Sequence, residues 1–263
     1  MRRYTANMKI ATWNVNSVRT RLDRILNWLD QHQPDVLCLQ EIKCREDDFP
    51  FEPIEQMGYF AEVAGQKSYN GVALLSRKLL TDVKIGMDHE ELDQQARVIS
   101  ATLDDMRIIS VYVPNGCDMS TEKYPYKKRW LKQFRQHLDD NYLPDQKLVV
   151  CGDTNIILED IDAADMTYWR NTGIGGNEIR EKFSQVTSWG LTDIYRNFHS
   201  ETGHYSWWSY RHLAFDKNRG LRIDHILATE PASKACSSMV IDKDQRAGAA
   251  PSDHAPVIAE FKN

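Results

Sequence analysis

Short apolar runs separated by polar turns recur along the whole chain, and this pattern predicts β-strands. The runs are rich in the β-branched and aromatic residues that strands favour. Some are apolar at every position, as in Val36-Leu37-Cys38-Leu39, which is typical of strands covered on both faces. We expect strands at 8–15, 36–41, 71–76, 97–103, 107–113, 147–152, 205–209, 223–228 and 256–261.

Helices are predicted between these runs, where apolar residues follow helical spacing. From Leu22, apolar side chains recur at i, i+3, i+4 and i+7, which places them on one face of a helix over 19–31. A second helix is predicted over 125–141 and a third over 178–189. Strands mixed with helices throughout indicate an α/β fold. Several connections are too short for a crossover helix, and this favours mixed or antiparallel sheets.

Composition narrows the class of protein. The 263 residues are 41% hydrophobic and 27% charged, with no repeat or flexible linker, so we expect a single domain over 8–263 and a loose N-terminal extension at 1–7. No apolar run approaches the ~18 residues of a membrane span. Five cysteines without a C-x-x-C pair argue against disulfides or a cysteine zinc site and predict a cytoplasmic protein. The net charge of −5 argues against binding polyanions by bulk charge alone.

Polar side chains stand where several predicted strands begin or end. Each alone is weak evidence, because Asn and Asp are common turn formers. Together they predict one rim at which strand ends converge. The set is Asn14, Asn16, Glu41, Tyr112, Asp153, Asn155, Asp224, Asp253 and His254.

These residue types suit a particular chemistry. Glu41, Asp253 and the amide oxygen of Asn16 are hard ligands, which favour Mg²⁺ or Mn²⁺ over zinc. A carboxylate at Asp224 would fix the tautomer of His254 and favour its charged form. Asp153 could orient or deprotonate a water molecule, while Asn155 and Tyr112 offer donors to a phosphoryl oxygen. The set therefore predicts metal-assisted attack of water on a phosphate ester.

The motifs also carry a resemblance to a known family. Trp-Asn-Val-Asn-Ser, Leu-Gln-Glu-Ile-Lys, Gly-Asp-x-Asn, Gly-Leu-Arg-Ile-Asp and Ser-Asp-His-Ala-Pro follow one another in the chain. In this order and spacing they resemble the endonuclease/exonuclease/phosphatase superfamily, most closely its bacterial exonuclease III-type apurinic/apyrimidinic endonucleases. The likeness covers residues 8–261. It implies a four-layer α/β sandwich, in which two mixed β-sheets pack face to face with helices outside.

The resemblance implies roles for the polar set. Glu41 would hold the metal ion, with Asn16 and Asp253 in or near its shell. Asp153 would position the attacking water, assisted by Asn14 and Asn155. Tyr112 would contact the scissile phosphate, and His254, backed by Asp224, would bind it. Whether Asp153 or the His254–Asp224 pair is the general base stays open.

The resemblance also implies how DNA is bound. Trp207, Leu221 and Ile223 align with a pocket for a flipped-out sugar that lacks its base, a site that costs least to fill where pairing is already lost; Trp207 could instead be a core residue. Basic or polar residues at loops and strand ends would contact the DNA backbone. They are Lys43, Lys67, Tyr69, Asn70 and Arg97. A further cluster either extends this footprint or is an exposed helix face: Lys123, Lys127, Lys128, Arg129, Lys132 and Arg135.

The prediction is thus a monomeric, magnesium-dependent DNA-repair phosphodiesterase acting on double-stranded DNA and not on membranes. It would incise 5′ to abasic sites, with 3′–5′ exonuclease activity and cleaning of blocked 3′ ends. The sequence departs from the family between Ile156 and Phe183, where glycine-rich 174–177 is expected to be mobile, and this leaves the balance of activities open. Thr154 and His225 are smaller departures.

Two alternatives remain. Catabolite repression control proteins share the fold but act as RNA-associated regulators with little or no nuclease activity, and a superfamily phosphatase would act on small or lipid phosphates. The retained polar set favours an enzyme, and the pocket residues favour DNA.

Overall fold

Two β-sheets of six strands each pack face to face in the computed structural model, which describes residues 7–262. The predicted N-terminal extension, apart from residue 7, lies outside the described residues. The first sheet has the order β11 (Cys236–Ile241), β12 (Val257–Phe261), β1 (Met8–Asn14), β2 (Val36–Gln40), β4 (Val72–Ser76), β3 (Phe60–Ala64). Its β1–β2 pair is parallel and its other pairs are antiparallel.

The second sheet is built in the same way. Its order is β5 (Thr81–Ile85), β6 (Val98–Leu103), β7 (Met106–Tyr112), β8 (Leu148–Asp153), β10 (Asp224–Ala228), β9 (Thr192–Asp193). Here β7–β8 is the parallel pair, and the remaining pairs are antiparallel. The prediction of two mixed sheets is therefore confirmed.

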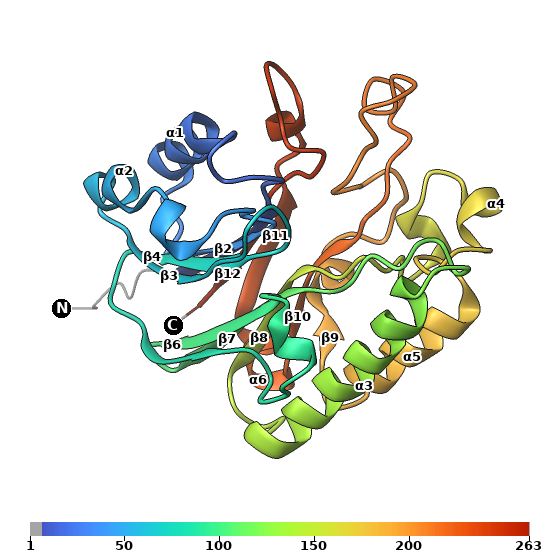
Figure 1. Ribbon diagram of the computed structural model, residues 1–263, viewed down its shortest axis with the longest axis horizontal. Coiled ribbons are helices and arrows are strands. Elements are labelled where there is room, and N and C mark those ends of the chain that lie inside the picture. Colours follow the sequence, from blue (N-terminus) through green and yellow to red (C-terminus); the bar gives the residue numbers. More distant parts are fainter. Residues whose placement is uncertain (1–6, 263) are drawn as a thin grey trace.

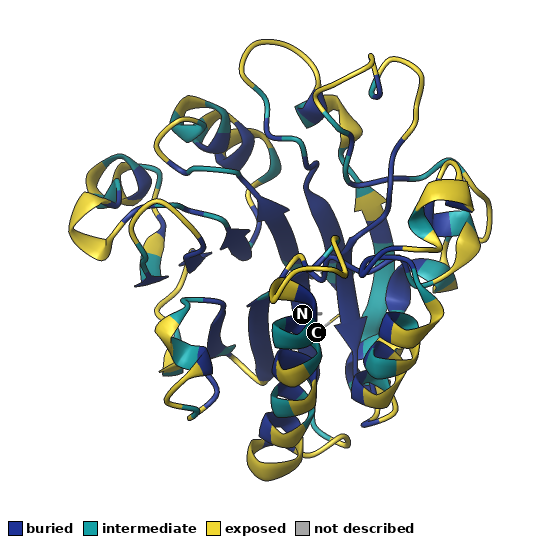
Figure 2. Cartoon of the chain, turned by 45° about the vertical axis from the view of Figure 1, so that its right-hand side comes forward, coloured by how far each residue is buried: buried dark blue, intermediate teal, exposed yellow. Residues whose placement is uncertain are grey.

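Helices cover the outer face of each sheet, which completes four layers (Figure 1). Helices α1 (Leu22–His32) and α2 (Phe51–Gln56) lie on the first sheet. Helices α3 (Lys123–Asn141) and α5 (Asn177–Thr187) lie on the second. The short helices α4 (Met166–Trp169) and α6 (Glu230–Ala235) lie in the connections. Figure 2 shows buried strands in the middle and helices whose outward faces are exposed.

The central core lies between the two sheets. Ile10 and Val36 of the first sheet belong to the same buried cluster as Ile108 and Val149 of the second. Because burying one such side chain is worth about 1.5–3 kcal/mol, this shared core fixes how the sheets sit on each other. In the outer cores, Trp28 of α1 packs with residues of the first sheet and Trp130 of α3 with residues of the second.

The predicted elements are found with small shifts at their ends, except for one. The strand predicted over 205–209 is wrong: Trp207 forms only isolated bridges, with Leu221 and His254. Strands β3, β5, β9 and β11 were not predicted. All four stand at the edges of the sheets, where a strand buries less surface and its apolar pattern is weaker. In β5, for example, four of the five residues are exposed.

Two further expectations are decided by the packing. All five cysteines are free, as their number and spacing predict. Glycine-rich 174–177, expected to be mobile, is packed: Ile174 is buried, and a Cβ on Gly175 would lie 2.8 Å from the carbonyl oxygen of Trp169. These glycines allow a close approach of backbones rather than looseness.

Within the described residues, no helix combines the length and the apolar character that crossing a membrane requires.

Candidate active site

The predicted rim exists because of the strand directions. Asn14 ends β1, Glu41 follows β2, and Asp153 ends β8. Strands β10 and β12 run antiparallel to β8 and β1, so the residues at their starts meet the ends of the other strands. Asp224 pairs in register with Asp153, and His254 lies just before β12. The site is thus shared by both sheets.

Asp153 is held by two donors at the centre of the rim. Its Oδ2 accepts from the amide Nδ2 of Asn14 (2.9 Å), and its Oδ1 accepts from the backbone N–H of Asn155 (2.9 Å). The same Asn14 Nδ2 donates to Glu41 Oε1 (2.9 Å). Asp153 is 1% exposed, and burial raises the pKa of its carboxyl to about 7, although His254 opposes the shift. A carboxylate with a pKa near the working pH suits proton transfer.

His254 lies between two carboxylates. Its Nδ1 is 2.8 Å from Asp224 Oδ2, and its Nε2 is 3.8 Å from Asp153 Oδ2. Burial alone would lower the pKa of this imidazole, but Asp224 and Asp153 outweigh burial and raise it to about 10. His254 therefore carries a positive charge at neutral pH, with Nε2–H facing Asp153.

The ligand atoms of Glu41, Asp153 and His254 lie within 4.8 Å of one another. Because the charged His254 has no lone pair to offer, the carboxylates of Glu41 and Asp153 are the members of this group that suit a cation. Burial would raise the pKa of the Glu41 carboxyl, but the neighbouring Lys43 ammonium holds it below its usual value. Lys43 Nζ lies 2.7 Å from Glu41 Oε2 and 2.6 Å from Asn16 Oδ1. The Lys43 ammonium thus contacts two oxygens that are predicted to bind the metal ion. This donor set fits a hard divalent ion.

Lys43 and Asp253 lie differently from what their predicted roles suggest. Lys43, predicted to contact DNA, turns its ammonium toward Glu41. Asp253, predicted as a metal ligand, uses both oxygens within the protein: Oδ1 accepts from Asn16 Nδ2 and Oδ2 from the indole Nε1 of Trp207, each at 3.0 Å. Asp253 therefore connects the candidate metal position to the predicted pocket wall.

The backbone at the site is strained. Asn16, Glu41, Lys43 and Asn155 all have φ between 46° and 53°, a left-handed conformation that L-residues adopt at a cost of order 1 kcal/mol or more each. Hydrogen bonds across the turns hold it, as between the backbone N–H of Ser17 and the carbonyl of Glu41 (2.7 Å). Such strain is typical of functional sites, where it fixes the direction of a side chain.

Tyr112 ends β7 beside this group. Burial, reinforced by Glu41 and Asp153, raises the pKa of its phenol well above the usual value, so the hydroxyl keeps its proton and can donate. Arg97 stacks over the Tyr112 ring at 4.6 Å and donates to its carbonyl (3.0 Å). With Asn70 and Tyr69 they line a cavity of about 390 Å³. Tyr69 is 72% exposed and Lys67 is exposed as well.

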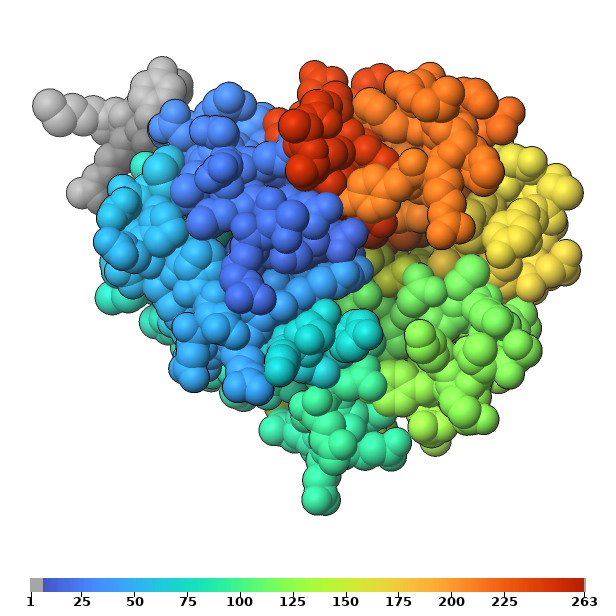
Figure 3. Space-filling model, turned by 45° about the horizontal axis from the view of Figure 1, so that its top comes forward, coloured from blue at the N-terminus to red at the C-terminus, as the bar shows by residue number. Residues whose placement is uncertain are grey.

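The predicted pocket residues also meet. Leu221 and Ile223 are buried in one small apolar cluster, against which Trp207 packs. The rings of Trp207 and Trp169 meet edge to face, with centroids 6.1 Å apart. Together with Leu221 these two tryptophans line a cavity of about 370 Å³. In Figure 3 the orange segment near residue 210 lies beside the red C-terminal segment at this end of the molecule.

Comparison with known proteins agrees with this geometry. Residues 11–254 match the Endonuclease/Exonuclease/phosphatase family. The chain belongs to this family. It is 34% identical to the exodeoxyribonuclease III of Haemophilus influenzae, over 97% of this chain and 100% of that protein.

Solved structures of the family superimpose closely. An AP endonuclease from Archaeoglobus fulgidus has a TM-score of 0.94 at 34% identity, covering 97% of this chain and 100% of that one. A 3′ phosphatase from Neisseria, bound to product DNA hairpin, has a TM-score of 0.94 at 40% identity with the same coverage. The fold expected from the resemblance is therefore confirmed.

Sequence reasoning missed the role of Lys127. Lys127, predicted with its basic neighbours either to extend the DNA footprint or to lie on an exposed helix face, is fully buried. Its Nζ donates to the carbonyls of Asn115 (2.9 Å), Asn155 (2.7 Å) and Gly173 (2.8 Å). Burial lowers the pKa of this amine to about 7. Lys127 thus ties together three loops, one of which carries the site residue Asn155.

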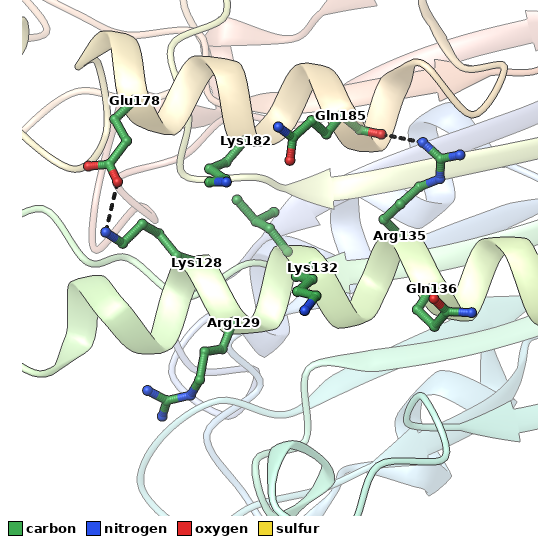
Figure 4. Close-up of a pocket in the computed structure, with 9 residues that line it drawn as sticks. Lys128, Arg129, Lys132, Arg135, Gln136, Glu178, Lys182 and Gln185 are labelled. Carbon is green, nitrogen blue, oxygen red and sulfur yellow. Dashed lines mark hydrogen bonds and ion pairs between the residues drawn. The ribbon is translucent and has the colours of Figure 1, made fainter.

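The remaining lysines and arginines of α3 are not buried, and two of them, Lys123 and Arg129, line the Tyr112 cavity. Four of them line a groove of about 550 Å³ between α3 and α5, together with Lys182 and Glu178 (Figure 4). Glu178 pairs with Lys128 at 2.8 Å. The four are Lys128, Arg129, Lys132 and Arg135.

Two serines and one histidine also support the site. Ser206 Oγ donates to Asp224 Oδ2 (2.6 Å), and Ser252 Oγ donates to the carbonyl of Asn14 (2.7 Å). The two departures from the family pattern contact each other, since Thr154 Oγ1 lies 2.8 Å from His225 Nδ1. Ser252 lies in the Ser-Asp-His-Ala-Pro motif and Ser206 next to Trp207, but only coordinates reveal their partners.

Proposed function

We propose that this chain is a divalent-metal-dependent nuclease that hydrolyses phosphodiester bonds in damaged DNA. One observation carries the proposal: the amide of Asn14 bridges Glu41 and Asp153, while the charged His254 lies 3.8 Å from Asp153. Three groups then surround one point: the Glu41 carboxylate that would hold the metal ion, the Asp153 carboxyl with its raised pKa, and the charged imidazole of His254. That combination suits attack of water on a phosphate ester.

In this mechanism Glu41 and Asn16 would hold the metal ion, which would neutralise charge on the phosphate. Asp153 accepts the proton of the attacking water and is kept in position by Asn14 and Asn155. His254 Nε2–H donates to a phosphoryl oxygen as negative charge develops there, and Asp224 keeps the imidazole charged. The Tyr112 hydroxyl donates to the same phosphate.

The substrate follows from the neighbouring cavities. The cavity at Trp207 and Leu221, which Asp165 and Arg219 also line, would accept a sugar without its base, and on this ground we propose incision 5′ to abasic sites. The cavity at Arg97 and Asn70 and the exposed Lys67 would contact the DNA backbone. The Neisseria relative is a 3′ phosphatase and the Haemophilus influenzae relative an exodeoxyribonuclease III. On these likenesses we also propose cleaning of 3′ ends and 3′–5′ exonuclease activity. A single domain, a monomeric state and a cytoplasmic location stay predictions from the sequence.

The test is incubation with an abasic-site duplex, a 3′-phosphate duplex and an undamaged duplex, each with Mg²⁺ or EDTA. We expect cleavage of the damaged duplexes with Mg²⁺ only. Asp153→Asn should slow it by about 10² to 10⁴, whereas the exposed Asp216→Asn should act as wild type. Absence of cleavage by the wild type with any divalent ion, together with RNA binding, would favour the regulator alternative.

A further inference from the structure

A second group of metal-ligating side chains lies outside the site described above. His199, Glu201 and His204 belong to the loop between the 3₁₀ turn Ile194–Asn197 and Trp207. Their ligand atoms lie within 4.8 Å of one another. Glu201 Oε1 is 3.6 Å from His199 Nδ1 and 3.2 Å from His204 Nε2. Two imidazoles and a carboxylate therefore face a common point.

Hydrogen bonds on the far side of each ring leave the inward nitrogens available. His199 Nε2 lies 2.8 Å from the backbone carbonyl of Met239. A carbonyl can only accept, so Nε2 carries the hydrogen and a neutral ring presents the lone pair of Nδ1 to Glu201. A lone pair facing a carboxylate is repulsive unless a cation or a proton lies between them.

His204 is oriented in the same manner. Its Nδ1 lies 2.6 Å from the hydroxyl of Tyr195, which leaves Nε2 directed at Glu201. Tyr195 is itself buried, and its ring stacks on His199 with centroids 4.4 Å apart. Metal-binding histidines generally donate their second N–H to a carbonyl, carboxylate or similar partner, which fixes the ring and its tautomer. His199 has such a partner in the Met239 carbonyl, and the Tyr195 hydroxyl can accept the Nδ1–H of His204 in the tautomer that leaves Nε2 free for a metal ion.

We propose that His199, Glu201 and His204 form a binding site for Zn²⁺ that is separate from the Glu41 group. Imidazole nitrogens with one carboxylate are ligands of zinc and similar transition metals, whereas Mg²⁺ prefers oxygen. The three side chains are 25%, 57% and 36% exposed, so an ion can enter and water can complete the tetrahedron. The two sites thus select different metals.

The position of the group gives the ion a structural role. Met239 belongs to the edge strand β11 of the first sheet, and Tyr195 follows the edge strand β9 of the second. His204 precedes Trp207, the predicted pocket wall, by three residues. A bound ion would therefore fasten the loop that leads to Trp207 to the edges of both sheets.

The test is calorimetric titration of Zn²⁺ into EDTA-stripped protein that carries Glu41→Gln, which disables the first site. One equivalent should bind, and excess Mg²⁺ should not displace it. His199→Gln and His204→Gln should each weaken the Zn²⁺ affinity at least tenfold, and Tyr195→Phe by about tenfold. The control is the exposed His212→Asn, which should bind as the parent.

Three further measurements distinguish a loss of metal binding from misfolding of a variant. Circular dichroism without metal should be unchanged in each variant, and Glu201→Gln, at the most exposed ligand, should show the same loss of affinity. Co²⁺ should give the visible absorption of a tetrahedral site in the parent and not in the histidine variants. Zn²⁺ uptake that is absent, or unaltered by these substitutions, would mean that the three residues are only hydrogen bonded, and would overturn the proposal.

Discussion

Asp153 and His254 both keep a proton to higher pH in the folded protein than in water, for opposite electrostatic reasons. The pKa of Asp153 rises to about 7 because burial disfavours a charged carboxylate. The pKa of His254 rises to about 10 because two carboxylates favour its cation more than burial disfavours it. A carboxylate that is easily protonated thus faces an imidazole that is hard to deprotonate, and this difference supports the roles proposed for them.

The His254 shift predicts how stability depends on pH. The folded state holds this proton up to about pH 10, whereas an unfolded histidine releases it near 6.5. The stabilisation is therefore complete below pH 6.5 and is lost as pH rises toward 10, by about 1.4 kcal/mol for each pH unit. Urea unfolding in EDTA at pH 7 and 9 measures it. Because other groups titrate in this range, the quantity to compare is the difference between wild type and His254→Gln, which should shrink at pH 9. If the difference in unfolding free energy between the two proteins did not change with pH, His254 would not be charged as assigned here.

Glu41 offers a second prediction at this scale. Its Oε2 contacts the Lys43 ammonium and its Oε1 the Asn14 amide. Glu41→Gln keeps the shape but removes the charge that a divalent ion needs, so the Mg²⁺ concentration for half-maximal cleavage should rise at least tenfold. The matched control is Glu62→Gln in β3, outside the site. An unchanged Mg²⁺ requirement would remove Glu41 from the metal site.

At the scale of elements, helix α3 supports the site through one buried amine. Lys127 donates to three carbonyls from three loops. Lys127→Met keeps the length but leaves these acceptors unpaired, so we expect a loss of about 2–4 kcal/mol in unfolding free energy and a fall in kcat larger than the change in KM. Lys128→Met, beside it but paired with Glu178 at the surface, should cost less than about 1 kcal/mol. Equal effects of the two substitutions would refute the role of Lys127.

The same elements show what could be read from the sequence. The central strands were predictable because they are buried on both faces, whereas edge strands such as β5 lack that signal. Lys127 was missed because charge was weighed above spacing: it lies three residues before Trp130 and seven before Phe134, on the same buried face. The polar strand ends predicted the rim, but the partners of Ser206 and Asp253 depend on loops whose paths no local pattern specifies.

At the scale of the whole molecule, positive charge is divided between the rim and the helical layer. Helix α3 begins at Lys123, which lines the Tyr112 cavity, and each residue along it moves about 1.5 Å farther away. Lys132 is thus roughly 14 Å beyond that start. The groove between α3 and α5 lies at the outer edge of the molecule (Figure 1), and Arg129 lines both this groove and the Tyr112 cavity.

This division predicts different salt dependences. Lys67→Ala should reduce the slope of log affinity against log salt concentration by about 0.9, as expected when one phosphate contact is lost. Lys132→Ala removes the same charge and should leave the slope unchanged. Fluorescence anisotropy with a labelled abasic duplex over a range of salt concentrations measures both. A reduced slope for Lys132→Ala would extend the DNA footprint along α3.

The bridge made by the Asn14 side chain has a consequence for how this protein can fail. The Nδ2 amide group donates to Glu41, which follows a strand of the first sheet, and to Asp153, which ends a strand of the second. The alignment of these groups therefore depends on how the apolar core between the sheets is packed. A slippage of about an ångström between the layers would break these contacts while every side chain of the rim remained intact. Turnover should therefore be a sensitive gauge of interior packing, lost under mild denaturant before the strands themselves come apart.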